Sequence, residues 1–304
     1  MTVTVFSHAA CLQHDLGNDH PEAPARLHAI FDQLLSSGLE YVIQHKDCTE
    51  ATEEQLKLVH DPAYVQWVQA RAPTDKLIWL DDDTAIMSKS IRAARYAAGA
   101  LINAVDTVMS TGDQQTFCAI RPPGHHAESN QAMGFCIFNN VAVGAAYALS
   151  KYQLKRILIV DFDVHHGNGT EQIFRDDPRV LFCSSFEHPL FPYTDPTSSD
   201  HILKMPLNGA SHGQIFRKQF SEQWLAKIHE FAPELIMISA GFDAHGEDEM
   251  AHLKWNEQDY HWIATQLKQI ADTHCQGRIV ACLEGGYACS ALGRSVVAML
   301  KAWV

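Results

Sequence analysis

Residues 157–169 read ILIVDFDVHHGNG, and the fold class and the site both follow from this stretch. Its unbroken apolar run, Ile157 to Val160, is typical of a strand buried on both faces of a parallel sheet. Asp161, Asp163 and His165 follow at intervals of two residues, so their side chains project to the same side of an extended backbone. Because carboxylates are seldom buried without partners, this strand end predicts a bound cation and a metal-dependent enzyme.

Helical and strand patterns alternate along the rest of the chain. The stretches that read as strands are Leu39–Ile43, Phe117–Ile120, Ile157–Val160, Val180–Ser184, Leu235–Ser239 and Ile279–Leu283. The clearest helical patterns are Ser90–Met109, Val141–Tyr152, Ile215–Phe231 and Trp255–Asp272. This alternation predicts an α/β fold with a mostly parallel sheet and helices on both faces, in one domain over residues 1–304.

Composition restricts the class of protein. The formal net charge of −13 argues against nucleic-acid binding, because phosphate contacts need clustered Lys and Arg, and it is compatible with a cationic substrate or a basic protein tail. Eight scattered cysteines without a CxxC pair are typical of a reducing compartment. No signal-like segment or membrane-length apolar run is present, so we expect a cytoplasmic protein that binds no membrane. The sequence leaves open whether it forms a homo-oligomer.

Four of the expected strands lead into loops rich in polar side chains. The loops are Arg121–His126, Asp161–Gly169, Ala240–His245 and Glu284–Tyr287. Ligands of open parallel α/β sheets bind beyond the carboxyl ends of the strands. We therefore expect these four loops to converge on one site.

The metal ligands expected in this site are Asp163, His165 and Asp243. Three protein ligands leave one coordination position open, as in catalytic zinc sites. Two carboxylates and one imidazole can also hold Fe(II), so the ligands are predicted more firmly than the metal. A single buried histidine is usually structural, but the position of His165 two residues after Asp163 favours a ligand.

Two adjacent histidines and one tyrosine are the candidates for proton transfer and charge stabilisation. His125 and His126 follow a rigid Pro-Pro-Gly turn and suit proton transfer near neutral pH, and Asp161 and Asn168 are placed to orient their rings. The pair alone would be a weak signal among 18 histidines. Tyr287 follows two glycines, where a tyrosine is more often a turn residue. A preorganised phenol there would stabilise an oxyanion by about 3 kcal/mol.

Five motifs then connect these residues to a known family. In chain order they are RPPGHHAE (121–128), GFCIFNN (134–140), DFDVHHGNGT (161–170), AGFDAH (240–245) and LEGGY (283–287). Together with HPEAPARL at 20–27 and Asp83-Thr84, they resemble the histone deacetylase superfamily, in particular its class II and bacterial histone-deacetylase-like amidohydrolase members. The resemblance implies the arginase/deacetylase fold, a three-layer α/β/α sandwich around a mostly parallel sheet of about eight strands.

The resemblance also implies an activity and its residues. The activity is hydrolysis of an N-acetyl amide, of acetyl-lysine or of a related acetylated amine. Asp163, His165 and Asp243 resemble the zinc ligands, Tyr287 the tyrosine that polarises the carbonyl, and His126 the main general base and acid. A potassium ion is implied nearby, held by side-chain and backbone oxygens of Asp161, Asp163, His165 and Ser184.

The second histidine and its neighbours carry further implied roles. His125 resembles the electrostatic partner of the general base, paired to Asp161. Asn168 stands where class I enzymes have an aspartate and class II relatives carry asparagine, so it marks the subclass.

The resemblance extends to a substrate channel, with departures at its rim. Phe135 and Phe191 would form the aromatic walls that grip a lysyl or amine stem, and Gly134 would offer its carbonyl to the substrate amide. Pro-Tyr-Thr-Asp at 192–195 replaces the usual Pro-Gly-Thr-Gly. Met250 lies where polyamine-specific members can carry a gatekeeping glutamate. Its presence weakens the case for an acetylpolyamine substrate without excluding one.

Two other classes of function remain as alternatives. An arginase-like ureohydrolase would need a second metal site with extra carboxylates, but Ser239–Asp243 contains only one aspartate. A non-enzymatic binding module would be expected to lose a metal ligand or Tyr287, and none is lost. A different acyl preference within the same hydrolase class stays open.

Overall fold

The computed structural model describes residues 3–17, 19–74, 76–112 and 114–304. Over these residues, the main sheet has eight strands in the order β2-β1-β5-β10-β9-β6-β7-β8, and all neighbouring strands in it are parallel. The strands are β1 (Val3–Ser7), β2 (Ile43–Asp47), β5 (Gln115–Cys118), β6 (Ile157–Asp161), β7 (Val180–Glu187), β8 (Ile202–Leu207), β9 (Leu235–Ala240) and β10 (Ile279–Leu283). The parallel α/β sheet predicted from the sequence is confirmed.

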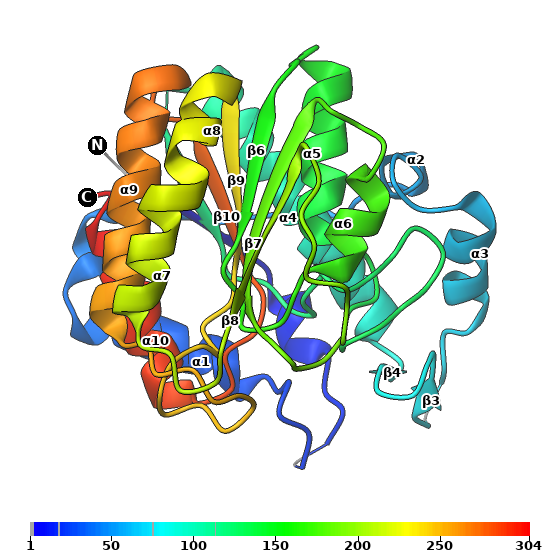
Figure 1. Ribbon diagram of the computed structural model, residues 1–304. Helices are drawn as coiled ribbons and strands as arrows, with labels where there is room; N and C mark the ends of the chain where they lie inside the picture. The colour runs from blue at the N-terminus through cyan, green and yellow to red at the C-terminus, as the bar shows by residue number, and fades with distance from the viewer. Residues whose placement is uncertain (1–2, 18, 75, 113) are drawn as a thin grey trace.

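Helices cover both faces of this sheet (Figure 1). On one face lie α1 (Ala25–Ser36), α7 (Gly213–Gln219), α8 (Leu225–Phe231), α9 (Glu257–His274) and α10 (Cys289–Lys301). On the other lie α4 (Ser90–Ser110), α5 (Asn140–Lys151) and α6 (Asn168–Phe174). The short helices α2 (Glu53–Leu56) and α3 (Pro62–Ala70) and the hairpin of β3 (Ile78–Trp79) and β4 (Ala85–Ile86) lie to one side. The arrangement is the expected three-layer sandwich.

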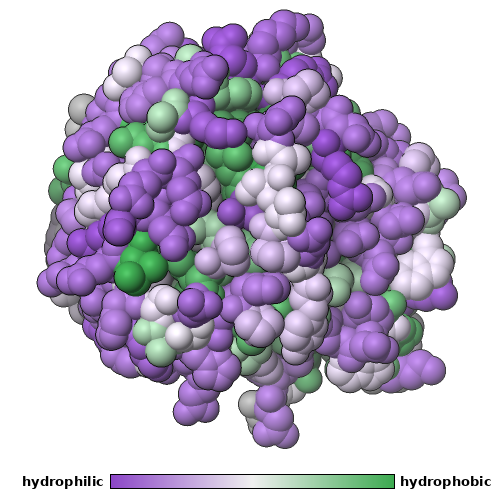
Figure 2. Space-filling view, viewed as in Figure 1, coloured by the Kyte–Doolittle hydropathy of each residue, from purple (hydrophilic) through white to green (hydrophobic). Residues whose placement is uncertain are grey.

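The central strands explain why the sequence reads as apolar runs. Every residue of β6, β9 and β10 is buried, because helices cover both faces of the sheet there. Helix starts are fixed by local hydrogen bonds: Asn139 accepts from the backbone N–H of Ala142 at the start of α5, and Asn256 and Asp259 form a capping box at α9. The outer surface seen from the same side is mostly hydrophilic, with scattered small apolar patches (Figure 2).

Three elements differ from the sequence expectations. The strand expected at Leu39–Ile43 is a 3-10 turn over Leu39–Tyr41, and the strand itself runs from Ile43 to Asp47. It is an edge strand with mostly exposed side chains, so it lacks an apolar signature. The other edge strand, β8, was not expected, and its Pro206 is exposed, as proline in an edge strand usually is.

The third difference lies in the helix expected over Ile215–Phe231. It is interrupted by a π-helical turn at Phe220–Trp224, which separates α7 from α8. The rings of Phe220 and Trp224 are both buried and lie 5.8 Å apart. The apolar pattern on this helix face is therefore real, but the extra residue of the π turn is invisible to a 3.6-residue period.

Candidate active site

The four polar loops expected to converge do so at the carboxyl ends of the strands. Asp161 pairs in register with Ser239 on β9 and with Ser184 on β7, so neighbouring strands end at one level. A cavity of about 200 Å³ opens there. It is lined by Asp83, His126, Gly134, Phe135, His165, Leu190, Phe191, Tyr193, Met250 and Tyr287. A larger cavity, about 550 Å³, lies beside α5 and α6, away from these side chains.

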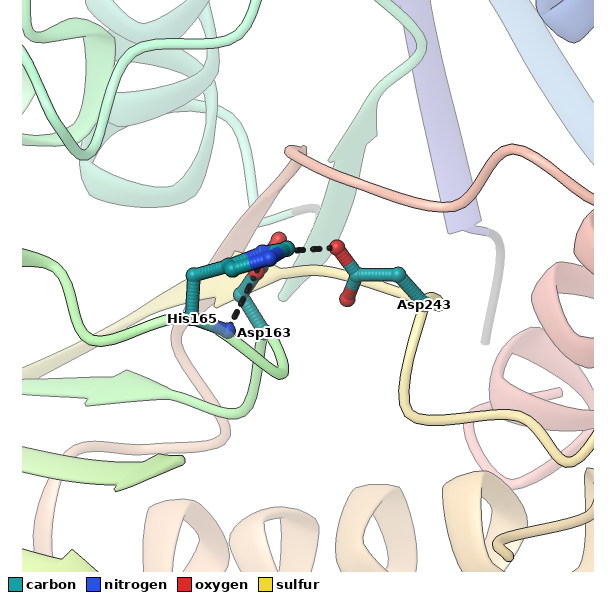
Figure 3. A group of neighbouring side chains, drawn as sticks. All are labelled: Asp163, His165 and Asp243. Carbon is teal, nitrogen blue, oxygen red and sulfur yellow. Dashed lines mark hydrogen bonds and ion pairs between the residues drawn. The ribbon is translucent and has the colours of Figure 1, made fainter. Parts of the chain in front are cut away.

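The side chains of Asp163, His165 and Asp243 meet at one point beside this cavity (Figure 3). Nδ1 of His165 lies 3.1 Å from Oδ1 of Asp163 and 3.2 Å from Oδ2 of Asp243. All three residues are buried, and they are the one group of three or more potential metal ligands found among the described residues. The structure therefore brings together the three residues that were expected to bind a metal.

Backbone amides orient the two carboxylates of this group. The N–H of Val164 donates to Oδ1 of Asp243 at 2.9 Å, and the N–H of Gly285 donates to Oδ2 of Asp163 at 2.8 Å. A Cβ atom on Gly285 would overlap both carboxylates, so only glycine fits there. The strand end and the Gly-Gly turn thus build the site jointly.

The donor set fits a divalent metal ion. Oδ2 of Asp243 is buried and receives no hydrogen bond from the described residues. Burial and the charge of Asp163 raise the pKa of Asp243 to about 6. Burial opposes a charge on His165, but its hydrogen bond to Asp163 and the nearby carboxylate of Asp243 outweigh burial and raise the pKa of His165 to about 10. Two buried carboxylates that favour a positive charge on His165 in this way would bind a cation.

The two adjacent histidines have different environments. Nδ1 of His125 lies 2.9 Å from Oδ2 of Asp161, whereas Nδ1 of His126 lies 2.8 Å from the amide oxygen of Asn168. Burial opposes protonation of His125, yet Asp161 and Asp163 raise its pKa to about 10. Burial, followed by the charges of His125 and His165, holds the pKa of His126 well below its usual value.

The two environments therefore act in opposite directions: they favour a proton on His125 and disfavour one on His126. Asn168 contributes to this difference between the two rings, because an amide adds no negative charge beside His126. The amide is fixed in place by donating from Nδ2 to Oε1 of Glu128 at 3.0 Å.

Tyr287 reaches the same cavity from the end of β10. The carboxylate of Asp248 accepts the N–H groups of Tyr287 and Ala288, at 2.6 and 2.9 Å, and the guanidinium of Arg26 lies 4.9 Å from the ring centre. Burial raises the pKa of Tyr287 well above its usual value, so the hydroxyl remains a hydrogen-bond donor. Asp248 and Arg26 were not assigned roles from the sequence.

Glu284 is a third residue whose role the sequence did not indicate. Its buried carboxylate accepts the N–H groups of Gly124 and His125, at 2.6 and 3.2 Å, and the hydroxyl of Ser239 at 3.0 Å. It therefore ties the loop of the two histidines to β9 and β10. The only available signal was an acidic residue directly after a fully buried strand.

The channel residues line the cavity as expected. The rings of Phe191 and His126 lie 5.2 Å apart, and those of Phe135 and Tyr287 lie 6.1 Å apart. Gly134, φ +57°, carries the turn into the channel wall, and its N–H donates to Asp83 at 2.8 Å. The Asp83 contact gives a structural reason for a residue that was recognised only as part of a motif.

Two other predicted residues lie where the sequence placed them. Met250 lines the outer part of the cavity together with Tyr287. Ser184 sits beside Asp161 on the neighbouring strand, and its hydroxyl lies 2.8 Å from Nδ1 of His166. Asp161 and Ser184 are thus register partners on neighbouring strands.

Comparisons with known proteins agree with this geometry. Residues 20–303 match the model of the histone deacetylase domain. The chain is 35% identical to uncharacterized protein slr0245 of Synechocystis, with 98% of each chain covered. It is 35% identical to the chloroplastic histone deacetylase 14 of Arabidopsis thaliana, covering 98% of this chain and 76% of that protein.

Two further matches extend the comparison. The chain is 38% identical to the polyamine deacetylase HDAC10 of Mus musculus, covering 92% of this chain and 44% of the mouse protein. The crystal structure of the HDA15 HD domain superimposes with a TM-score of 0.91 at 30% identity, over 99% of this chain and 87% of that one. In the part of the chain that the structure describes, no helix is both long and apolar enough to span a membrane.

Proposed function

The chain belongs to the histone deacetylase family and is an amide hydrolase of the deacetylase type. We propose that it removes the acetyl group from acetyl-lysine in proteins or peptides. The observation that carries the proposal is the buried Asp163–His165–Asp243 group beside two differently charged histidines. We assign residues 1–304 to one catalytic domain.

Zn²⁺ is the metal that we propose for this group, with Fe²⁺ as the alternative. Two carboxylates and one imidazole are ligands that both metals accept. When bound there, the metal would polarise the amide carbonyl and lower the pKa of a water molecule. K⁺ would bind near Asp161 and Ser184 as a structural ion.

The side chains then divide the proton transfers between them. His126, which is neutral, takes a proton from the attacking water through Nε2, because its Nδ1 is held by Asn168. The hydroxyl of Tyr287 donates a hydrogen bond to the oxyanion that forms on the former carbonyl oxygen. An imidazolium of the pair protonates the leaving amine, and the charge on His125 favours release of that proton from its neighbour.

The channel would orient the substrate for this chemistry. The rings of Phe135 and Phe191 both line the cavity, where they would flank the apolar stem of a lysine side chain and exclude water around it. The carbonyl of Gly134 would accept the N–H of the substrate amide. In the described structure this carbonyl is also the acceptor for the thiol of Cys136, at 3.3 Å.

An acetylpolyamine is the second candidate substrate. Its support is the relationship to a mammalian protein named as a polyamine deacetylase, together with the net charge of −13. Met250 at the channel mouth argues for acetyl-lysine, because a thioether cannot pair with a second ammonium group. A ureohydrolase is not supported, since one metal-ligand group is found among the described residues.

The state of the cysteines supports a proposal for the cellular compartment. All eight are free, and seven are buried. This is the pattern of a protein kept in a reducing compartment, and we propose the cytoplasm.

The function is tested by measuring acetate release from purified, zinc-loaded protein. Acetyl-lysine peptides, N-acetylpolyamines and longer acyl-lysine peptides are compared at matched concentrations. We expect the highest kcat/KM for acetyl-lysine peptides and complete loss of turnover for His126→Ala. A higher kcat/KM for N-acetylpolyamines would replace the substrate assignment, and turnover of none of these amides would overturn the proposed function.

A further inference from the structure

Tyr193 stands at the mouth of the substrate channel. It lines the same cavity as Phe191 and Met250, yet 75% of its surface is exposed. It occupies the position in the 192–195 segment where the family pattern has glycine. A large aromatic side chain therefore lies at the entrance to the substrate channel.

The backbone of Tyr193 is in a conformation that disfavours this side chain. Its φ is +59°, in the left-handed region that glycine adopts freely and that residues with a Cβ adopt at a cost. The turn is held by the N–H of Tyr193, which donates to the carbonyl of Leu190 at 2.9 Å. Strained residues of this kind concentrate at ligand sites, where the surrounding structure maintains them.

The ring of Tyr193 lies mostly in solvent, with 75% of the residue's surface exposed. No hydrogen bond of its hydroxyl, and no contact with another ring or a cation, is found among the described residues. The aromatic rings deeper in the channel differ, because Phe191 contacts His126 and Phe135 contacts Tyr287. Neither packing nor hydrogen bonding accounts for a tyrosine at this position.

We infer that Tyr193 is a specificity-determining residue that contacts the substrate outside the channel, on the residues that flank acetyl-lysine in a peptide. The inference rests on the proposed deacetylase function and deepens it. The cavity of about 200 Å³ holds the acetyl group and the lysine stem, so the peptide backbone and its neighbouring side chains remain at the mouth. A rigid, exposed aromatic ring offers them a large contact area at little cost in conformational entropy.

The experiment compares two substrates that differ only outside the channel. One is a seven-residue acetyl-lysine peptide, and the other is an N-acetylated alkylamine that ends at the mouth. For Tyr193→Gly we expect KM for the peptide to rise about tenfold with little change in kcat, as for loss of a contact in a binding hot spot. The ratio of kcat/KM between peptide and alkylamine should fall by a similar factor. Tyr193→Phe should keep the wild-type ratio.

Two control variants separate this role from a structural one. Tyr41→Gly removes a tyrosine that is 86% exposed but does not line the cavity. Gln276→Gly relieves a positive φ of +58° just before β10, at the amino end of this central strand and so at the opposite end from the site. Both should keep the wild-type ratio, and Tyr193→Gly should unfold at a temperature no lower than wild type, because it relieves the strained backbone.

Each of the other outcomes contradicts the inference. An unchanged ratio in Tyr193→Gly, with full turnover of both substrates, would overturn it and leave the proposed function standing. An equal loss for peptide and alkylamine would show that the ring acts inside the channel or on the fold, and would also overturn it. Turnover of neither substrate by the wild-type protein would overturn the proposed function and this inference with it.

Discussion

His125 and His126 are neighbours in the sequence, yet their partners give them opposite properties. A carboxylate faces the first ring and an amide faces the second. The pKa of His125 is raised to about 10, while that of His126 is held well below its usual value. A pair of titratable groups whose environments separate their pKa values is the arrangement that acid–base catalysis requires. We propose that the difference between Asp161 and Asn168 serves catalysis by separating the pKa values of the two rings.

The hydroxyl of Tyr287 gives the first prediction at the residue scale. Tyr287→Phe removes the donor to the oxyanion while keeping the ring above Arg26. We expect kcat to fall by about 10²–10³-fold, with KM and metal content unchanged. Steady-state kinetics and metal analysis on the same sample check this. A variant with wild-type kcat would exclude Tyr287 from charge stabilisation.

The carboxylate of Glu284 holds the loop of the two histidines, and its replacement should therefore affect turnover. Glu284→Gln keeps the size of the side chain but replaces an acceptor of two backbone N–H groups by a neutral amide. Because the loop of His125 and His126 depends on these bonds, we expect kcat to fall by about tenfold with KM nearly unchanged. Ser239→Ala is the matched control, since it removes one bond to the same carboxylate without touching the loop. Equal kinetics in the two variants would contradict a positioning role.

At the scale of elements, the start of α5 is joined to the histidine loop. Nε2 of His60 accepts the N–H of Asn139 at 2.9 Å, and its Nδ1 donates to the carbonyl of Glu128 at 3.0 Å. The amide of Asn139 in turn donates to the carbonyl of Ala127 at 3.1 Å. A neutral, buried imidazole therefore supports the segment on both sides of the catalytic loop.

This arrangement predicts loss of stability in mild acid. Burial lowers the pKa of His60 to about 4, below the ordinary value, so the unfolded chain binds a proton before the folded one does. The contribution of neutral His60 to the free energy of unfolding is present above about pH 6.5 and is lost as the pH falls toward 4. The free energy of unfolding should therefore fall by about 2 kcal/mol between pH 7 and pH 5. Urea unfolding at both pH values measures it. His60→Gln should show a smaller difference between them, and an equal difference would contradict the prediction.

The elements also show which parts of the fold the sequence could predict. Runs such as Ile157–Val160 and Ile279–Leu283 are apolar because both faces of the sheet are covered, and they were recognised. The edge strand Ile43–Asp47 exposes most of its residues and was misplaced for that reason. A strand at the edge is defined by its pairing with a neighbour, which a single sequence does not reveal.

At the scale of the whole molecule, the site exists only because the sheet brings distant segments together. Gly285 donates to Asp163 across 122 positions of the chain, and Val164 donates to Asp243 across 79. The residue types after each strand predicted which loops converge and which three side chains, Asp163, His165 and Asp243, lie together there. The supporting contacts of Glu284 and Asp248 could not be predicted, because they depend on which backbone N–H groups the fold leaves unpaired.

Removal of the metal should affect both the turnover and the stability of the whole protein. Without a cation the carboxylates of Asp163 and Asp243 are buried close together, so a chelator should abolish turnover and lower the unfolding temperature. Zinc at about 1,000 times its Kd should restore about 4 kcal/mol of stability. Thermal unfolding with and without zinc measures this, with Asp243→Asn as the control that should lose most of the shift. A chelated enzyme with full activity would contradict a metal-dependent mechanism.

We propose that one divalent ion binds between Asp163, His165 and Asp243 and faces the paired histidines. Anomalous diffraction from crystals of the zinc-loaded protein tests it most directly. We expect one strong zinc peak per chain, within bonding distance of these three side chains and next to His126. A peak elsewhere, or two peaks sharing the carboxylates, would contradict it.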